Sequence, residues 1–128
     1  MVRIITRLDE VKKEYTELEE LALGDFKVGT IIGKLRAIIA ARDIEIKANE
    51  ARSIKIKQIK IPANHITFLA AYASNRYGHT VAVGEEIPLP MALEKTVDRA
   101  FFLAGFDGSI KKDDLLGVLI LLPVEVMR

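Results

Sequence analysis

The chain has 128 residues, of which 50% are hydrophobic and 29% are charged, and its formal net charge is +1. This length favours a single domain, the apolar content excludes a disordered chain, and the near-neutral charge gives no whole-surface attraction to nucleic acid. Because the chain has no cysteine, a disulfide framework, a thiolate zinc site, an iron–sulfur cluster and a cysteine nucleophile are all excluded.

The N-terminal segment has the pattern of an amphipathic helix, preceded by a short strand at residues 2–6. Between residues 8 and 22, apolar residues recur at three- and four-residue spacing with charged residues between them, which predicts one buried stripe. Thr6 or Asp9 can cap the start of this helix, and Gly24 is placed to end it. The apolar stripe consists of Leu8, Val11, Tyr15, Leu18 and Leu21.

Beyond Gly24, the spacing of apolar residues changes to the alternation that is typical of strands. Ile44 and Ile46 alternate with charged residues, which predicts a strand with one wet face. Residues 66–73 and 79–83 are further predicted strands. Residues 115–126 (LLGVLILLPVEV) are almost uniformly apolar, so we expect this last strand to be covered on both faces.

The alternation in SIKIKQIKI (53–61) slips by one residue between Ile56 and Ile59. One extra residue near Lys57–Gln58 restores the inward-facing set, so we predict a β-bulge there. Pro62 either ends this strand or places it at the edge of a sheet.

Two segments, 26–35 and 110–119, share a faint pattern of a lysine-bearing turn, two aliphatic residues, a glycine and a strand. The aligned pairs are Lys27 with Lys111, Gly33 with Gly117, and Leu35 with Leu119. The match is either chance or the trace of a pseudo-duplicated fold built from two hairpins.

We predict a mainly β single domain over residues 1–128. Its body (25–128) is a compact β-barrel or barrel-sandwich, and the strand and helix of residues 1–24 pack on it.

Four stretches of the chain resemble an archaeal family of unknown function, number twenty-two in the domain-of-unknown-function series. They are GKLRAIIA, RDIEIKANEARSIKIKQIKIPANH, NRYGHTVAVGEEIPLP and DRAFFLAGFDGSIKKDDLLGVLILLPVEV. The resemblance covers nearly the whole chain from about residue 25. It implies an archaeal cytoplasmic protein with no assigned activity, so it transfers no catalytic residue to any position.

A metal site depends on the two histidines of the chain, His65 and His79. Two imidazoles with one or two carboxylates make an open zinc or iron site, but no local HxH or HExxH spacing gathers the ligands here. The favoured alternative is that Asn64–His65 is a polar corner after Pro62 and that His79 begins a strand. The candidate carboxylates are Glu50, Glu85, Glu86 and Asp98.

The stretch NRYGHTVAVGEEIPLP (75–90) is the strongest candidate site. Arg76 and Tyr77 can gather with His79 around an anionic substrate, with the guanidinium as anion clamp and the imidazole as acid/base. Glu85 and Glu86 are adjacent, so their side chains point to opposite faces of an extended backbone and only one can enter a cleft. The favoured alternative is a Tyr-Gly turn with an outward arginine.

A basic stripe of Arg52, Lys55, Lys57 and Lys60 follows one strand, near Lys47. No aromatic residues interleave for base stacking, so a solvated strand face explains the stripe better than nucleic-acid binding.

The sequence carries no nucleotide, flavin, haem or iron–sulfur signature. Two functional hypotheses follow. The first is a small ligand-binding or assembly module whose binding residues include Arg76, Tyr77, His79, Asn64 and His65. The second is a small enzyme acting on an anionic metabolite, with His79, Glu85 and Glu86 as catalytic candidates. We expect a homo-oligomer, because the C-terminal strand is strongly apolar and one strand can stand at a sheet edge. We expect a cytoplasmic protein with no membrane partner, because no signal peptide or membrane-spanning run is present. Abundant Glu, Lys, Arg and Ile are typical of thermophiles.

Overall fold

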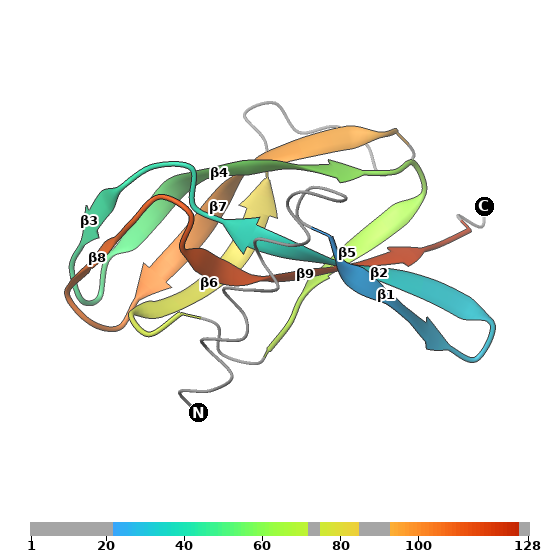
Figure 1. Cartoon of the computed structure of the whole chain (residues 1–128), viewed down its shortest axis with the longest axis horizontal. Coiled ribbons are helices and arrows are strands. Elements are labelled where there is room, and N and C mark those ends of the chain that lie inside the picture. Colours follow the sequence, from blue (N-terminus) through green and yellow to red (C-terminus); the bar gives the residue numbers. More distant parts are fainter. Residues whose placement is uncertain (1–21, 72–74, 85–92, 126–128) are drawn as a thin grey trace.

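A computed structural model of the chain describes residues 22–71, 75–84 and 93–125 (Figure 1). These residues form nine β-strands, and no helix lies among them. The mainly β class is therefore confirmed. The predicted strand at 2–6 lies outside the described residues, as does the predicted helix except for its last residue, Ala22, which belongs to a strand.

The strands form three antiparallel sheets. The four-stranded sheet has the order β1-β2-β9-β5, with strands Ala22–Val28, Ile31–Ile39, Leu115–Pro123 and His65–Leu69. The three-stranded sheet has the order β4-β7-β6, with strands Ala51–Ile61, Lys95–Ala104 and Gly78–Gly84. The two-stranded sheet pairs β3 (Ile44–Ile46) with β8 (Gly108–Ile110).

The described strands do not form a closed barrel, so this part of the predicted fold is corrected. Closure requires every strand to pair on both sides, whereas β1, β5, β4 and β6 stand at the ends of their sheets. Alternation identifies the inward residues of a strand but does not say which strands are its neighbours. The barrel expectation went beyond what alternation can show.

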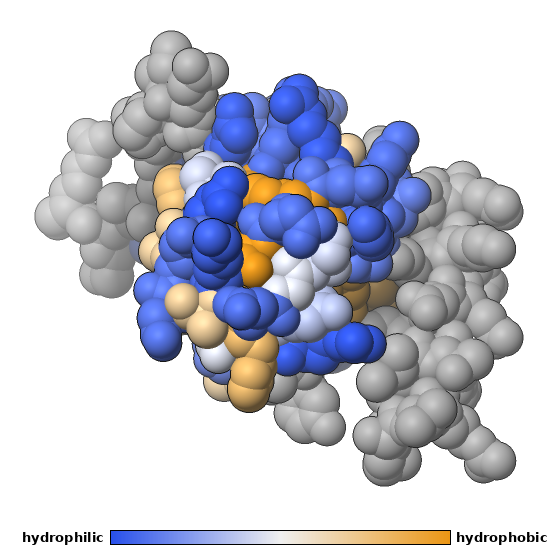
Figure 2. All heavy atoms as spheres, turned by 90° about the vertical axis from the view of Figure 1, so that its left-hand side faces the viewer, coloured by the Kyte–Doolittle hydropathy of each residue, from blue (hydrophilic) through white to orange (hydrophobic). Residues whose placement is uncertain are grey.

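One hydrophobic core joins the four-stranded sheet to the three-stranded sheet. Ile38 and Leu121 of the first sheet and Ile54 and Phe102 of the second belong to the same buried cluster. Burying each such side chain stabilises the fold by about 1.5–3 kcal/mol. The end of the molecule that carries β3 and β8 is largely hydrophilic, with a few hydrophobic side chains showing at its centre (Figure 2).

A β-bulge lies in β4 at the predicted place, but it contains two extra residues and not the one that was predicted. Lys55 pairs with Arg99 and Ile59 pairs with Val97, so residues 56–58 stand opposite Asp98 alone. The isoleucines on both sides of the bulge remain buried, as the phase slip in the sequence requires. At the bulge, Ile56 also bridges to Ala40 beyond the end of β2. β4 ends at residue 61, directly before Pro62, and lies at a sheet edge.

Gly24 lies within a strand and does not end a helix, which corrects the predicted role of this residue. The register of β1 shifts between Ala22 and Gly24, and Gly24 has a φ of 122°. This backbone conformation is open to glycine and strained for other residues. A helix terminus and a strand bulge both call for glycine, so the residue type alone did not separate them.

The two faces of β9 are not equally covered. Leu119 and Leu121 are fully buried on one face, whereas Val118 and Ile120 on the other face are only half-buried. The expectation that this apolar strand is covered on both faces is thus met on one face only among the described residues.

The faint repeat does not recur as two equivalent hairpins. β1 pairs with β2, the next strand along the chain, whereas β8 pairs with β3 and not with β9. The aligned segments 26–35 and 110–119 therefore have different partners in the fold.

Candidate functional site

Residues 75–78 form a tight turn, which we call the Asn75 turn, between the two larger sheets. The Asn75 side chain accepts a hydrogen bond from the Tyr77 N–H (2.9 Å) and donates one to the Leu115 carbonyl of β9 (3.0 Å). Gly78 lies against the backbone of β7, where a Cβ would come within 2.9 Å of the Ala104 Cα. These contacts fix where the turn places its side chains.

Tyr77 connects this turn to the segment between β7 and β8. Its carbonyl accepts hydrogen bonds from the Gly105 N–H (2.7 Å) and the Phe106 N–H (3.2 Å). The half-buried ring covers Gly108, where a Cβ would meet the ring atoms. Tyr77 therefore has a packing role in the turn.

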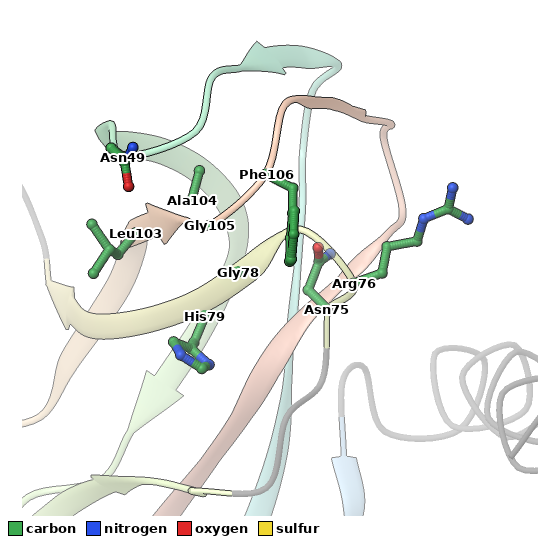
Figure 3. A pocket seen from close by; sticks show the side chains of 9 residues that line it. All are labelled: Asn49, Asn75, Arg76, Gly78, His79, Leu103, Ala104, Gly105 and Phe106. Carbon is green, nitrogen blue, oxygen red and sulfur yellow. The ribbon is translucent and has the colours of Figure 1, made fainter.

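Arg76 and His79 do not converge on one point. Both side chains are exposed, and the Arg76 guanidinium lies over the Tyr77 ring, 5.0 Å from its centroid. Figure 3 shows the Arg76 side chain extending away from His79 and the residues beside it. Glu85 and Glu86 lie outside the described residues. The described part of the chain thus places the anion clamp and the acid/base candidate apart.

A hollow of about 340 Å³ lies beside His79 (Figure 3). It combines the Asn75 turn with residues from two distant segments, the turn before β4 and the end of β7. Its volume is at the lower end of the range for small-molecule sites, about 300–1,000 Å³. The lining residues are Asn49, Asn75, Arg76, Gly78, His79, Leu103, Ala104, Gly105 and Phe106.

The hollow has an apolar wall and two polar side chains that are available to a ligand. Phe106 is 66% exposed and Leu103 is 44% exposed. Asn49 is held at a φ of 66°, and its N–H donates to the Ala104 carbonyl (2.8 Å). The side chains of Asn49 and His79 make no hydrogen bond with other described residues, whereas both ends of the Asn75 amide are used in the turn.

A second hollow of about 340 Å³ lies on the other side of His79, between β6, β9 and the end of β5. Thr80 is buried at its wall and donates a hydrogen bond from its hydroxyl to the Leu116 carbonyl (3.0 Å). Apart from His79 and Thr80, the side chains that line this hollow are aliphatic, and Gly117 completes the lining.

Asn64 and His65 lie at the opposite end of β5 from His79. Asn64 has a φ of 57°, and its carbonyl accepts a hydrogen bond from the Val124 N–H (2.8 Å). His65 Nδ1 is 3.0 Å from the Ala63 carbonyl oxygen, to which it donates when protonated at that nitrogen. His65 pairs with Pro123 at the start of β5, whereas the second hollow contacts this strand only at Leu69, its last residue.

The candidate metal ligands are likewise dispersed. No group of three histidine or acidic side chains gathers within the described ranges. Glu50 forms an ion pair with Arg52 (3.1 Å). Asp98 stands opposite the β4 bulge, with one buried carboxylate oxygen that has no hydrogen-bond partner among the described residues.

Three residues of the basic stripe lie beside carboxylates. In addition to the Arg52 pair, Lys57 is 2.7 Å from Asp113 and Lys60 is 3.9 Å from Glu94. These pairs reduce the positive charge that the stripe offers to phosphates, which favours the solvated strand face.

The comparison with known families identifies the chain. The family described as "Domain of unknown function DUF22" matches residues 1–108. The chain belongs to the DUF22 family. An uncharacterised protein of the archaeon Methanocaldococcus jannaschii is 40% identical over 126 residues, which cover 96% of this chain and 92% of that protein. No solved structure matches.

The resemblance to this family is confirmed, but its extent is corrected. The DUF22 match begins at residue 1 and ends at residue 108, so it includes the N-terminal segment and leaves out β9. In the described part of this DUF22 chain, no helix is long and apolar enough to cross a membrane.

Sequence reasoning missed five residues of the hollow, all of them 25 or more positions away from the Asn75 turn along the sequence. They are Asn49, Leu103, Ala104, Gly105 and Phe106. Phe106 offered one usable signal, because it is a large aromatic residue directly before the predicted Asp107–Gly108 turn. An apolar side chain placed in a turn is a candidate for an exposed contact residue.

Proposed function

We propose that this DUF22 protein is a small ligand-binding module and that the hollow beside His79 is its binding site. Its ligand is a small molecule with an apolar body and a hydrogen-bonding group. The observation that carries the proposal is an exposed Phe106 in the same hollow as Leu103, together with the side chains of Asn49 and His79, which form no hydrogen bond with other described residues. An apolar cavity with a few well-placed polar groups is the usual form of such a site.

The geometry favours a neutral ligand over the anionic ligand expected from the sequence. Arg76 is the charged residue of the lining, and its guanidinium extends away from the hollow (Figure 3). A bidentate grip on a carboxylate or phosphate needs the guanidinium to face the ligand. The same divergence removes support from the enzyme hypothesis, which requires Arg76 and His79 to act on one substrate.

The apolar body of the ligand can contact the outer face of the three-stranded sheet. Leu103 pairs with His79 across β6 and β7, and the next outward residue of β7 is Phe101, which is 44% exposed. The apolar wall of the hollow thus continues along the outer face of the three-stranded sheet. A ligand that buries Phe106 and Leu103 removes apolar surface from water, which stabilises the complex by about 25 cal/mol per Å² before the costs of association.

The test uses ligand-observed NMR with three probes: cyclohexanol, p-cresol and benzoate. We expect cyclohexanol or p-cresol to bind the parent protein, with benzoate no tighter. Phe106→Ala and Leu103→Asn should abolish this binding. The matched control is Phe68→Ala, because Phe68 is 49% exposed on β5 and lies outside the hollow; this variant should bind as the parent does.

Two results would overturn the proposal. The first is that none of the probes binds, or that Phe106→Ala binds them as well as the parent does. The second is a stable homodimer in sedimentation experiments that excludes the probes and that Leu103→Asn dissociates. This second result would assign the apolar surface to assembly, which was the other expectation from the sequence.

A further inference from the structure

The tip of the β1–β2 hairpin is a two-stranded extension of the four-stranded sheet. β2 pairs with β9 only from Lys34 onward, so residues 31–33 pair with β1 alone among the described strands. Figure 1 shows the hairpin extending beyond the neighbouring strands. Its apolar residues Val28 and Ile32 are 61% and 55% exposed. Because a two-stranded hairpin by itself is only marginally stable in water, a further strand would stabilise this extension.

The outer edge of β1 carries main-chain groups that no described strand pairs with. β1 stands at the end of its sheet, and a two-residue turn at 29–30 closes its hairpin. The residues on either side of such a turn bond to each other, and bonded and non-bonded pairs alternate along an antiparallel ladder. The alternation therefore turns the N–H and C=O groups of Phe26 toward β2 and those of Asp25 and Lys27 toward the open edge. Asp25 and Lys27 are both exposed.

We propose that β1 pairs antiparallel with β1 of a second copy of the chain, about a two-fold axis at Phe26. This register sets Asp25 opposite Lys27 of the second copy, and Lys27 opposite Asp25 of the second copy. Each of these two pairs exchanges two main-chain hydrogen bonds, because their N–H and C=O groups face the shared edge. Opposite charges directly across a ladder stabilise it. The pairing joins the two four-stranded sheets into one continuous sheet.

The side chains of β1 fit this register. Phe26 meets its own copy at the axis, in a closely spaced pair with Cα atoms about 4.5 Å apart, and an aromatic pair across two strands is favourable. Val28 lies opposite Gly24 of the second copy. Gly24 has no side chain, and a Cβ built there meets nothing within 4 Å. The exposed Val28 side chain therefore has room to lie over the second copy.

Charge complementarity selects β1 over the other sheet edges. β1 carries one acidic and one basic residue two positions apart, which makes the strand complementary to itself in the antiparallel direction. Self-pairing of β4 would bring its lysines Lys55, Lys57 and Lys60 together, and its bulge interrupts the edge. β5 carries no acidic residue and no lysine that would fix a register, and β6 faces β9 across the second hollow.

The contact is expected to be weak and to be independent of the hollow beside His79. A ladder over residues 24–28 is short, which places it among the weak interfaces of less than roughly 1,200 Å². No residue of β1 lines the hollow, so the dimer leaves the hollow open to the probes. Either proposal can therefore fail without the other.

Charge reversal tests the register. In sedimentation velocity at low salt, the parent should shift toward a dimer as its concentration rises. Asp25→Lys and Lys27→Asp each set like charges opposite each other at both symmetric positions, and each should weaken dimerisation about tenfold or more. An equimolar mixture of the two variants restores both opposite-charge pairs and should dimerise as the parent does.

Two control variants change residues outside β1. Glu94→Lys makes the same change of charge as Asp25→Lys, at an exposed residue directly before β7. Leu103→Asn changes the exposed face of the three-stranded sheet. Both controls should dimerise as the parent does.

A single cysteine gives a second test, because the parent has none. Phe26→Cys places two thiols at the axis, where Cα atoms about 4.5 Å apart lie within the roughly 7 Å limit for a disulfide. This variant should form an interchain disulfide rapidly under gentle oxidation, as read by non-reducing electrophoresis. Val28 is more exposed than Phe26 but lies about 14 Å from its own copy, so Val28→Cys should oxidise several-fold more slowly.

Hydrogen–deuterium exchange of the unmodified protein guards against variants that do not fold. The amides of Asp25 and Lys27 should exchange several-fold more slowly in concentrated than in dilute solution, whereas the amide of Phe26, which bonds to β2, should not change. A parent that stays monomeric at millimolar concentration, or single charge variants that dimerise as the parent does, would overturn the proposal. A dimer that Leu103→Asn dissociates and Asp25→Lys does not would also overturn it, and would assign association to the three-stranded sheet.

Discussion

Replacing Asn75 by alanine should destabilise the protein measurably, because one side chain makes both anchoring bonds of the turn. The bond from the Tyr77 N–H (2.9 Å) closes the turn, and the bond to the Leu115 carbonyl (3.0 Å) ties it to β9. Each bond contributes about 0.5–1.5 kcal/mol to stability. Because the site is half-buried, water replaces part of what is lost, and we expect Asn75→Ala to lower the unfolding free energy by about 1–2 kcal/mol.

Thermal and chemical denaturation followed by circular dichroism measure this loss. For a chain of 128 residues, 1 kcal/mol corresponds to about 4 °C in Tm, so the expected decrease is about 4–8 °C. Asn75→Asp keeps the acceptor for the Tyr77 N–H but cannot donate to Leu115, and it should lose at least about 1 kcal/mol. Arg76→Ala is the control in the same turn and should stay within about 0.5 kcal/mol of the parent. An Asn75→Ala protein as stable as this control would refute the reasoning.

Three further predictions concern backbone conformation, packing and charge. Asn64→Gly should leave stability within a few tenths of a kcal/mol, whereas Asn64→Ala should cost about 1 kcal/mol, because the φ of 57° suits glycine better than alanine; equal denaturation midpoints for the two would contradict this role. Gly108→Ala should cost about 1–3 kcal/mol by displacing the Tyr77 ring, and in a double-mutant cycle the loss should be smaller in a Tyr77→Ala background; strict additivity would argue against the contact. Lys57→Met should cost less than about 1 kcal/mol at low salt and still less at high salt, because the pair with Asp113 is partly exposed; a larger loss that salt does not change would show that packing, not charge, dominates.

Local features of the fold were readable in the sequence where two independent signals coincided. The β4 bulge combined a shift of alternation with a following proline, and both appear in the structure. Gly24 offered only its residue type, which suits both a helix terminus and a strand bulge, and the interpretation as a helix terminus was wrong. Strand order was not readable, because β9 pairs with β2 and β5 through register and core packing, which no single strand encodes.

The candidate site was predictable only as a turn. The Tyr-Gly pair correctly indicated a turn before the strand that carries His79. The direction of Arg76 depends on the Tyr77 ring next to it, and the hollow depends on Asn49 and Phe106, which the pairing of distant strands brings to the Asn75 turn. Contacts between residues so far apart in the chain follow from the complete fold and leave no local pattern.

The central place of β9 has a consequence for biosynthesis. β2 and β5 both pair with this strand, and they precede it by about 80 and 50 residues along the chain. During synthesis, the edges of β2 and β5 that pair with β9 therefore stay unpaired until residues 115–123 emerge from the ribosome. Pairing over such sequence separations folds slowly, and exposed edges invite aggregation. Of the described strands, β9 is the last to be synthesised, and its pairing with β2 and β5 removes the exposed edges that favour misassembly.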